Sequence, residues 1–217
     1  MKERTHQKIG LSLYYFLKAI ILLSAFVALL KQEWETAFYI FLIFLLTFIP
    51  TVVKRKYRLY MPVTFDLYTS FFIFISLFLG EIHNYYFKFW WWDIYMHSQG
   101  GIFLGLGGFI LVYVLNEQRN ASVHMKPGFI SFFAFTFAIA FGVVWEIFEF
   151  FMDSMFGLNM QKSGLVDTMW DLIFGAGGAL ITATLGYFWL KKKFPFTLFD
   201  RSVSNFVRKN KFLFKEW

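Results

Sequence analysis

Long apolar runs alternate with short polar segments along most of the chain. Six such runs can be drawn, at residues 10–30, 36–53, 64–82, 94–115, 129–152 and 166–190. Each is long enough to cross about 30 Å of hydrocarbon as an α-helix, which rises ~1.5 Å per residue. The pattern predicts an all-α fold, a polytopic membrane bundle of about six transmembrane helices.

The composition supports this fold and excludes several others. Of the 217 residues, 58% are hydrophobic and 24% aromatic, far more than in a typical soluble domain. We expect one transmembrane helical domain over residues 1–193, located in the cell membrane as a multi-pass protein. The first run, at about 20 residues, is too long for the core of a signal peptide, so we interpret it as a retained helix. The chain has no cysteine, which excludes disulfides and thiolate metal sites.

Positive charge is distributed unevenly between the loops. If the N-terminus is cytoplasmic, 17 of the 21 lysine and arginine residues lie in cytoplasmic segments, and only Lys31, Lys88 and Lys162 lie in outer loops. This asymmetry predicts that both termini are cytoplasmic, the N-in/C-in topology. It also explains the net charge of +7 without nucleic acid as a partner.

Residues 194–217 are predicted to form a basic, amphipathic cytoplasmic tail. Phe199, Val203 and Phe206 lie near one face of a helix, and most of the basic residues lie elsewhere. Such a helix suits the anionic inner leaflet, so membrane lipids are the expected partners. The sequence identifies no protein partner.

Ionisable residues within the apolar runs gather at one side of the predicted bundle. Asp93 and His97 begin the fourth run, Glu146, Glu149 and Asp153 end the fifth, Asp167 and Asp171 begin the sixth, and Glu81 ends the third. In the predicted topology all of them lie toward the outer side. Charged residues are costly in hydrocarbon and normally face a protein interior or a wet cavity, so this gathering predicts a functional site.

Helical spacing places these residues on shared faces. Residues three, four or seven apart lie on one face, so each run presents a single polar stripe. His97, Glu146 and Asp171 lie deepest, roughly 6–9 Å below the outer boundary, and we predict that they are the catalytic residues of an outward-facing site. Residues nearer the boundary, namely Asp93, Asp153 and Asp167, could instead be solvated helix caps.

Small residues continue two of the polar stripes toward the inner side. They are Gly101, Gly105 and Gly108 after His97, and Gly175, Ala179 and Thr182 after Asp171. Small residues four apart let helices approach closely in lipid, so we predict that the fourth and sixth runs pack against each other. Such packing would hold the polar residues above it at short range, although the glycines could be purely structural.

The acidic cluster also predicts a cation. Like charges in a low dielectric repel strongly, so either some carboxylates are protonated or a cation lies among them. Oxygen ligands with one imidazole suit magnesium, manganese or calcium, and zinc if only three or four groups bind. The sequence contains no Walker loop, HExxH motif or nucleophile elbow. The candidate metal ligands are Asp93, His97, Glu146, Glu149, Asp167 and Asp171.

The spacing of these residues resembles that of a known group. The pattern WWD-x3-H-x3-G, then WE-x2-E, then D-T-x2-D-x3-GA is similar to one in an uncharacterised bacterial family of small polytopic membrane proteins, which includes the inner-membrane protein YjdF. The resemblance covers residues 64–190 and marks the six candidate ligands as signature positions. A fainter likeness runs to VanZ-like proteins, although Asp171 stands in place of their asparagine and no arginine precedes Asp167. Neither group has an established reaction, so the resemblance implies a shared site without naming its chemistry.

Three functions fit this site. The first is a metal-assisted hydrolase or transferase acting on a lipid or lipid-linked phosphate, with His97 as acid or base. The second is a cation or proton transporter, and the third is a non-catalytic protein that binds a lipid or a partner. A transporter usually continues its polar pathway to the other face, whereas the inner halves of the last three runs carry no charged residue. This one-sidedness favours an enzyme or a binding site that opens outward over a transporter.

Overall fold

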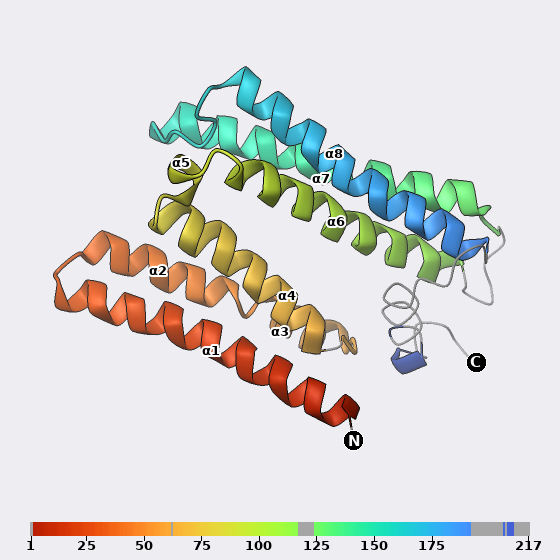
Figure 1. Ribbon diagram of the computed structural model, residues 1–217, viewed down its shortest axis with the longest axis horizontal. Coiled ribbons are helices and arrows are strands. Elements are labelled where there is room, and N and C mark those ends of the chain that lie inside the picture. The colour runs from red at the N-terminus through yellow and green to blue at the C-terminus, as the bar shows by residue number, and fades with distance from the viewer. Residues whose placement is uncertain (1, 62, 117–123, 192–205, 207, 211–217) are drawn as a thin grey trace. The chain divides into compact units, whose positions relative to one another are not determined.

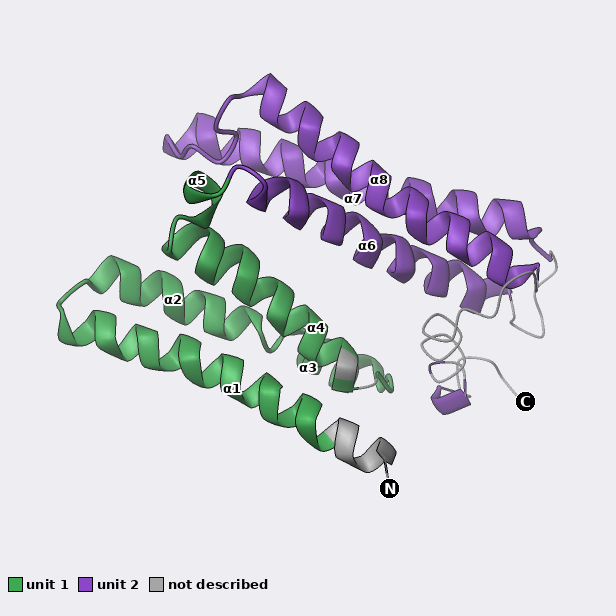
Figure 2. Ribbon diagram, in the orientation of Figure 1, with its two compact units in different colours: residues 1–89 green, residues 90–217 purple. Residues whose placement is uncertain are grey.

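The computed structural model describes residues 2–61, 63–116, 124–191, 206 and 208–210, and within them every element is a helix (Figure 1). The helices divide into two compact units, residues 1–89 and 90–217, which are described separately below (Figure 2). Most of the expected tail at residues 194–217 lies outside the described residues. Its amphipathic character and the domain boundary at residue 193 therefore stay predictions.

Six helical stretches of the described chain are long and apolar enough to cross a membrane. They are Lys8–Leu30, Trp34–Tyr57, Phe65–Ile82, Trp92–Asn116, Pro127–Phe156 and Leu165–Leu190. Each coincides with one of the apolar runs, so the all-α, multi-pass architecture predicted from the sequence is confirmed. The direction in which they cross stays a prediction from the loop charges.

Unit 1 holds three of these stretches. Its helices are α1 (Lys2–Leu30), α2 (Trp34–Leu46), α3 (Ile49–Tyr57), α4 (Val63–Ile73), η1 (Phe74–Ile82) and α5 (Tyr85–Lys88). α1 packs against α2 and α4, and its Ile21, Ala25 and Ala28 meet Ile40 of α2 and Phe78 of η1 in one apolar core. The alanines let the helices approach closely, as small residues do at helix contacts in lipid.

Two stretches of unit 1 are not the continuous α-helices that the sequence pattern predicts. The second breaks at Thr47 and Phe48, because Pro50 at the start of α3 has no N–H to donate back to α2. The Thr47 hydroxyl donates to the carbonyl oxygen of Phe44 at 2.6 Å, which helps to close the last turn of α2. The third stretch widens from an α-helix into the π-helix η1 at Phe74. The apolar run continues through each change, to Val53 beyond the first and to Ile82 beyond the second, so the apolar pattern alone does not locate either.

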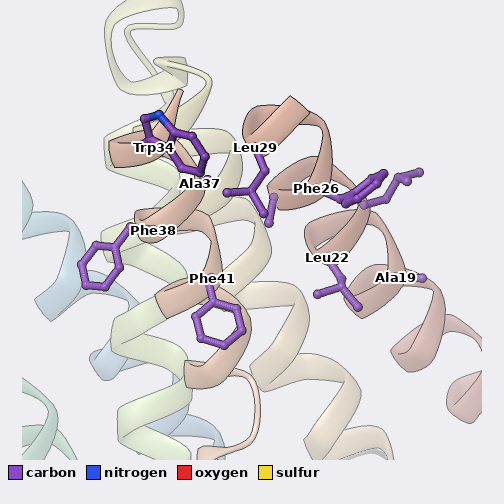
Figure 3. Close-up of a pocket in the computed structure, with 10 residues that line it drawn as sticks. Ala19, Leu22, Phe26, Leu29, Trp34, Ala37, Phe38 and Phe41 are labelled. Atoms are coloured by element: carbon purple, nitrogen blue, oxygen red, sulfur yellow. The ribbon is translucent and has the colours of Figure 1, made fainter. Parts of the chain in front are cut away.

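A groove of about 760 Å³ lies between α1 and α2 in unit 1 (Figure 3). Leu22 and Phe26 line it from α1, and Phe38 and Phe41 line it from α2. The indole of Trp34 carries the one hydrogen-bonding group among the lining side chains. The groove therefore suits hydrocarbon and offers no group for acid, base or metal chemistry.

Unit 2 is a three-helix bundle of α6 (Trp92–Asn116), α7 (Pro127–Phe156) and α8 (Leu165–Leu190), each packed against the other two (Figure 1). α6 and α8 run in the same direction, and α7 runs in the opposite one. Where α6 and α8 end and α7 begins, Phe109 and Val112 of α6 pack against Ile130 and Ala134 of α7. Apolar packing thus closes this end of the bundle, and the polar residues occupy the other.

The backbones of α6 and α8 touch along a strip of small residues. A Cβ atom added at Gly101 would lie 2.0 Å from the carbonyl oxygen of Gly175, and one added at Gly178 would lie 2.1 Å from that of Ser98. No side chain fits between the helices at either position. The predicted packing of the fourth and sixth runs is therefore confirmed.

Farther from the polar end, the glycine stripe of α6 divides between two partners. Gly105 still faces α8, where an added Cβ atom would lie 3.1 Å from Cβ of Thr182. Gly108 faces α7 instead, because an added Cβ atom there would lie 2.8 Å from the ring of Phe137. Gly108 lies on nearly the same face of α6 as Gly101, so the change of partner reflects the close approach of Phe137 of α7 at this level of the bundle. All three glycines of the expected stripe therefore lie at helix contacts, Gly101 and Gly105 against α8 and Gly108 against α7.

Candidate metal centre

Ionisable side chains from all three helices meet at the polar end of unit 2. α6 supplies Asp93 in its first turn and His97 one turn later, and α8 supplies Asp167 in its first turn and Asp171 one turn later. α7 runs the other way and brings Glu146 and Glu149 to the same end. Helical spacing of three or four residues puts each pair on one face, as the sequence predicts.

His97 lies at the centre of these side chains. Its Nε2 is 3.4 Å from Oδ1 of Asp93 and 3.8 Å from Oδ2 of Asp171. On the other side of the ring, Nδ1 is 3.8 Å from Oε1 of Glu146. One imidazole therefore faces carboxylates from α6, α7 and α8, and both of its ring nitrogens have an acidic neighbour.

The deepest carboxylates are shielded from the surroundings. Glu146 is 5% exposed and Asp171 is 3% exposed. Neither oxygen of Glu146 has a hydrogen-bond partner of ordinary geometry among the described residues, although the hydroxyl of Thr168 and Nδ1 of His97 lie close by. A buried carboxylate without a strong partner is costly in apolar surroundings, so this position calls for a proton or a positive charge.

Three of the predicted ligands form a group that could hold a metal ion. Asp93, His97 and Asp171 each offer one ligand atom, and these atoms all lie within 4.8 Å of one another. The other three candidates lie around this group. Glu146 faces His97 from behind, Glu149 is buried and accepts a hydrogen bond from Nε1 of Trp145 at 2.9 Å, and Asp167 is only half-buried.

Asp153 has a structural role instead. Its Oδ1 accepts the backbone N–H of Met160 at 2.7 Å and its Oδ2 accepts that of Gln161 at 2.9 Å. This carboxylate therefore anchors the loop that joins α7 to α8, a role that the sequence did not indicate. Glu81, another predicted member of the outer cluster, belongs to η1 of unit 1.

Sequence reasoning missed one residue of the site. Lys162, in the loop between α7 and α8, forms an ion pair with Oδ2 of Asp93. The apolar spans contain no lysine or arginine near the cluster, so the sequence offers no counter-charge there. The only available signal is that Lys162 is the sole lysine or arginine between residues 127 and 190 and lies five residues before Asp167.

Exposed aromatic side chains surround the polar end. Trp145 and Phe148 of α7 and Trp170 of α8 are 41%, 43% and 52% exposed. Tryptophan is enriched where hydrocarbon meets the headgroups, because its ring is apolar and its N–H is polar. The site is thus polar inside and aromatic outside, as expected close to a membrane boundary.

The helices and the site together define a class: a multi-pass membrane protein with a polar centre at one end of a three-helix bundle. The model of a family described as "Predicted membrane protein (DUF2238)" matches residues 12–192, and the chain belongs to this family. An uncharacterized protein of Thermotoga maritima is 29% identical over 150 residues, which cover 68% of this chain and 74% of the relative. No solved structure matches the chain. The family resemblance inferred from the spacing of acidic residues agrees with this membership.

Proposed function

We propose that unit 2 binds a divalent cation between Asp93, His97 and Asp171. We further propose that the protein is a metal-assisted hydrolase or transferase acting on a lipid or lipid-linked phosphate. One observation carries this proposal: an imidazole lies between two carboxylates, with a third, buried carboxylate behind it. An acidic cluster alone would not suffice, but the buried carboxylate of Glu146 has no hydrogen-bond partner of ordinary geometry, and positive charge on the neighbouring His97 and its cation would stabilise it.

The donor atoms suit a small divalent cation. Ligand atoms lie about 2.1 Å from magnesium or zinc, so neighbouring ligand atoms are about 3 Å apart. The distances from His97 Nε2 to Asp93 and Asp171, at 3.4 and 3.8 Å, exceed this by less than 1 Å and need only small side-chain rotations. Two carboxylates and one imidazole suit magnesium, manganese or zinc, whereas calcium would need further oxygen ligands.

Glu146 supports the same assignment from the other side of the ring. A metal-bound histidine commonly donates its second N–H to a carboxylate, which fixes the ring and increases its basicity as a ligand. Here Nε2 of His97 faces the two aspartates while Nδ1 faces Glu146 at 3.8 Å. Asp93, His97 and Asp171 are therefore the proposed ligands, and Glu146 is the proposed positioning residue.

The surroundings support a lipid phosphate as the substrate class. A divalent cation supplies polarisation of a phosphoryl oxygen and activation of water when it is bound. The buried carboxylates close one side of the site, and the exposed Trp145, Phe148 and Trp170 flank it with apolar surface. An acyl or polyprenyl chain could lie against that surface while its phosphate reaches the polar end.

Elemental analysis of the purified protein tests the cation. The wild type should contain a stoichiometric divalent metal, which His97→Ala and Asp171→Asn should lose. Glu81→Gln removes an acidic group from unit 1 and serves as the matched control that keeps the metal. A chelator should lower the melting temperature of the wild type, and excess metal should restore it by mass action.

A wild type without stoichiometric metal, whose melting ignores the chelator, would make the metalloenzyme proposal wrong. A proton relay or a structural polar cluster would then be the better assignment. If metal is present, phosphate release from lipid phosphates by the wild type and not by Asp171→Asn tests the reaction.

A further inference from the structure

The loop between α7 and α8 is held in place at both of its ends. On the α7 side, Asp153 accepts the backbone N–H groups of Met160 and Gln161. On the α8 side, Nε2 of Gln161 donates to Oγ1 of Thr168 at 2.8 Å. Lys162 directly follows Gln161 in the sequence. The three hydrogen bonds made by Met160 and Gln161 therefore hold the backbone of Lys162 next to the site.

The ammonium group of Lys162 contacts the carboxylate that the proposed metal would use. It pairs with Oδ2 of Asp93, whose Oδ1 faces His97. Asp167 also lies within electrostatic reach of Lys162. Lys162 and a divalent cation would therefore compete for the carboxylate of Asp93. Binding of the cation would weaken the ion pair between Asp93 and Lys162.

A site built mainly of carboxylates repels an anionic substrate. The carboxyl groups of Asp93, Glu146, Glu149, Asp167 and Asp171 supply no positive charge, whereas a phosphate group needs positive charge and N–H donors. One divalent cation offsets only part of this charge. Lys162 is the sole lysine or arginine between residues 127 and 190, and its backbone is already held beside the metal position.

Resting on the proposed function, we infer that Lys162 is the residue that recognises the substrate phosphate. Lys162 pairs with Asp93 before the cation binds. When the cation binds, it neutralises the carboxylate of Asp93 and weakens its ion pair with Lys162. The ammonium group of Lys162 can then donate to a phosphate oxygen beside the metal. A flexible lysine stem on a fixed backbone allows this exchange without movement of a helix.

The inference predicts that removing the ammonium group of Lys162 leaves metal affinity unchanged or higher but lowers phosphate affinity. A lysine with only a structural role would not change the two affinities in this way. Loss of the ammonium removes a competitor of the metal, so Lys162→Gln should bind Mn²⁺ at least as tightly as the wild type. The same change removes a phosphate donor, so the affinity for inorganic phosphate should fall by about tenfold. Lys162→Arg should restore phosphate binding, because a guanidinium also donates to phosphate oxygens.

The experiment uses the full chain in detergent, with Mn²⁺ as the metal probe and inorganic phosphate as the anion probe. Mn²⁺ affinity is measured by calorimetry, and phosphate affinity by the rise in melting temperature of the Mn²⁺-loaded protein. Lys88→Gln is the matched control and should behave as the wild type, because Lys88 ends α5 of unit 1 and its ammonium group donates to the carbonyl oxygen of His83. Lys162→Met is the second variant if Lys162→Gln does not fold.

The outcomes separate the two proposals. If Mn²⁺ binds and phosphate stabilises Lys162→Gln as much as the wild type, the role of Lys162 is wrong while the metal site stands. The role of Lys162 is also wrong if phosphate does not stabilise the Mn²⁺-loaded wild type. If Mn²⁺ does not bind to the wild type, the proposed function fails, and the role of Lys162 fails with it.

Discussion

A single imidazole joins the three helices of unit 2 at their polar end. His97 of α6 faces Asp171 of α8 through Nε2 and Glu146 of α7 through Nδ1. A rotation of this ring therefore changes contacts on two other helices at once. Glu146 is the carboxylate best placed to prevent that rotation, since it lies behind the ring and is almost fully buried.

Replacing Glu146 with glutamine should weaken metal binding by about 10–100-fold, because the carboxylate that orients His97 is lost. Glu149→Gln is the matched control, on the same helix and similarly buried, but with its Oε1 bonded to Trp145 rather than close to His97. Metal titrations of both variants measure the difference. Equal affinities for the two variants would show that Glu146 does not position the histidine.

The meeting of His97, Glu146 and Asp171 could be predicted from the sequence, because helical spacing and depth are local properties that need no knowledge of the fold. The pairing of Lys162 with Asp93 could not. These residues are 69 positions apart, and a loop has no periodicity from which the direction of a side chain could be read. The separate role of Asp153 was equally hidden, since its partners are backbone N–H groups that are present in every sequence.

At the scale of elements, the contact between α6 and α8 leaves no room for a side chain. Gly101→Ala places a methyl group 2.0 Å from the carbonyl oxygen of Gly175, so the helices must move apart. We expect a loss of about 1–3 kcal/mol of stability, the range typical of overpacked sites. Thermal melting in detergent measures it.

Gly107→Ala is the control for this change, because an added Cβ atom at Gly107 meets nothing within 4 Å. It lies on the same helix, and its melting temperature should equal or slightly exceed that of the wild type, since alanine favours a helix over glycine. Similar melting of the two variants would mean that the helices separate easily at Gly101.

The loop between α7 and α8 is an element with its own anchor. Asp153→Ala removes both carboxylate acceptors of the loop backbone, which should cost about 1.5–3 kcal/mol for hydrogen bonds to a charged group. Hydrogen exchange at the amides of Met160 and Gln161 should become faster. Ser154→Ala, an exposed neighbouring change, should leave the exchange unaltered. Unchanged exchange in Asp153→Ala would show that the loop is held by other contacts.

The long helices could be predicted from hydropathy, but their interruptions could not. Pro50 lies inside the predicted run at residues 36–53, yet proline is tolerated in membrane helices, so its presence alone does not place a break. The change to a π-helix at Phe74 depends on how the turns pack against their neighbours, and that is a tertiary property.

At the scale of the whole molecule, the predicted topology remains to be measured. Reporter fusions at Lys56 and at Trp217 should both report a cytoplasmic location, because 17 of the 21 lysine and arginine residues lie on that side in the predicted topology. A fusion within the loop at Gln161 should report the opposite side. A cytoplasmic signal at Gln161 would place the metal site at the inner face and remove outer-leaflet lipids as substrates.

The family match covers both units, although the polar site lies entirely in unit 2. Residues 12–192 include the three stretches of unit 1, which offer an apolar groove and no cluster resembling that of unit 2 among the described residues. The two compact units thus also differ in chemistry, since unit 1 offers an apolar groove and unit 2 carries the polar site.

The ion pair between Asp93 and Lys162 also constrains how the protein is made. Ribosomes add about 5–20 residues per second, so α6 enters the membrane several seconds before Lys162 and α8 are synthesised. Over that interval, Asp93 lacks Lys162, His97 lacks Asp171, and Gly101 has no α8 backbone to pack against. The last hairpin of the chain therefore completes the polar centre in one step. A nascent chain halted before residue 162 lacks both Lys162 and α8, so Asp93 and His97 stay without these partners. We expect membrane quality control to degrade such a chain.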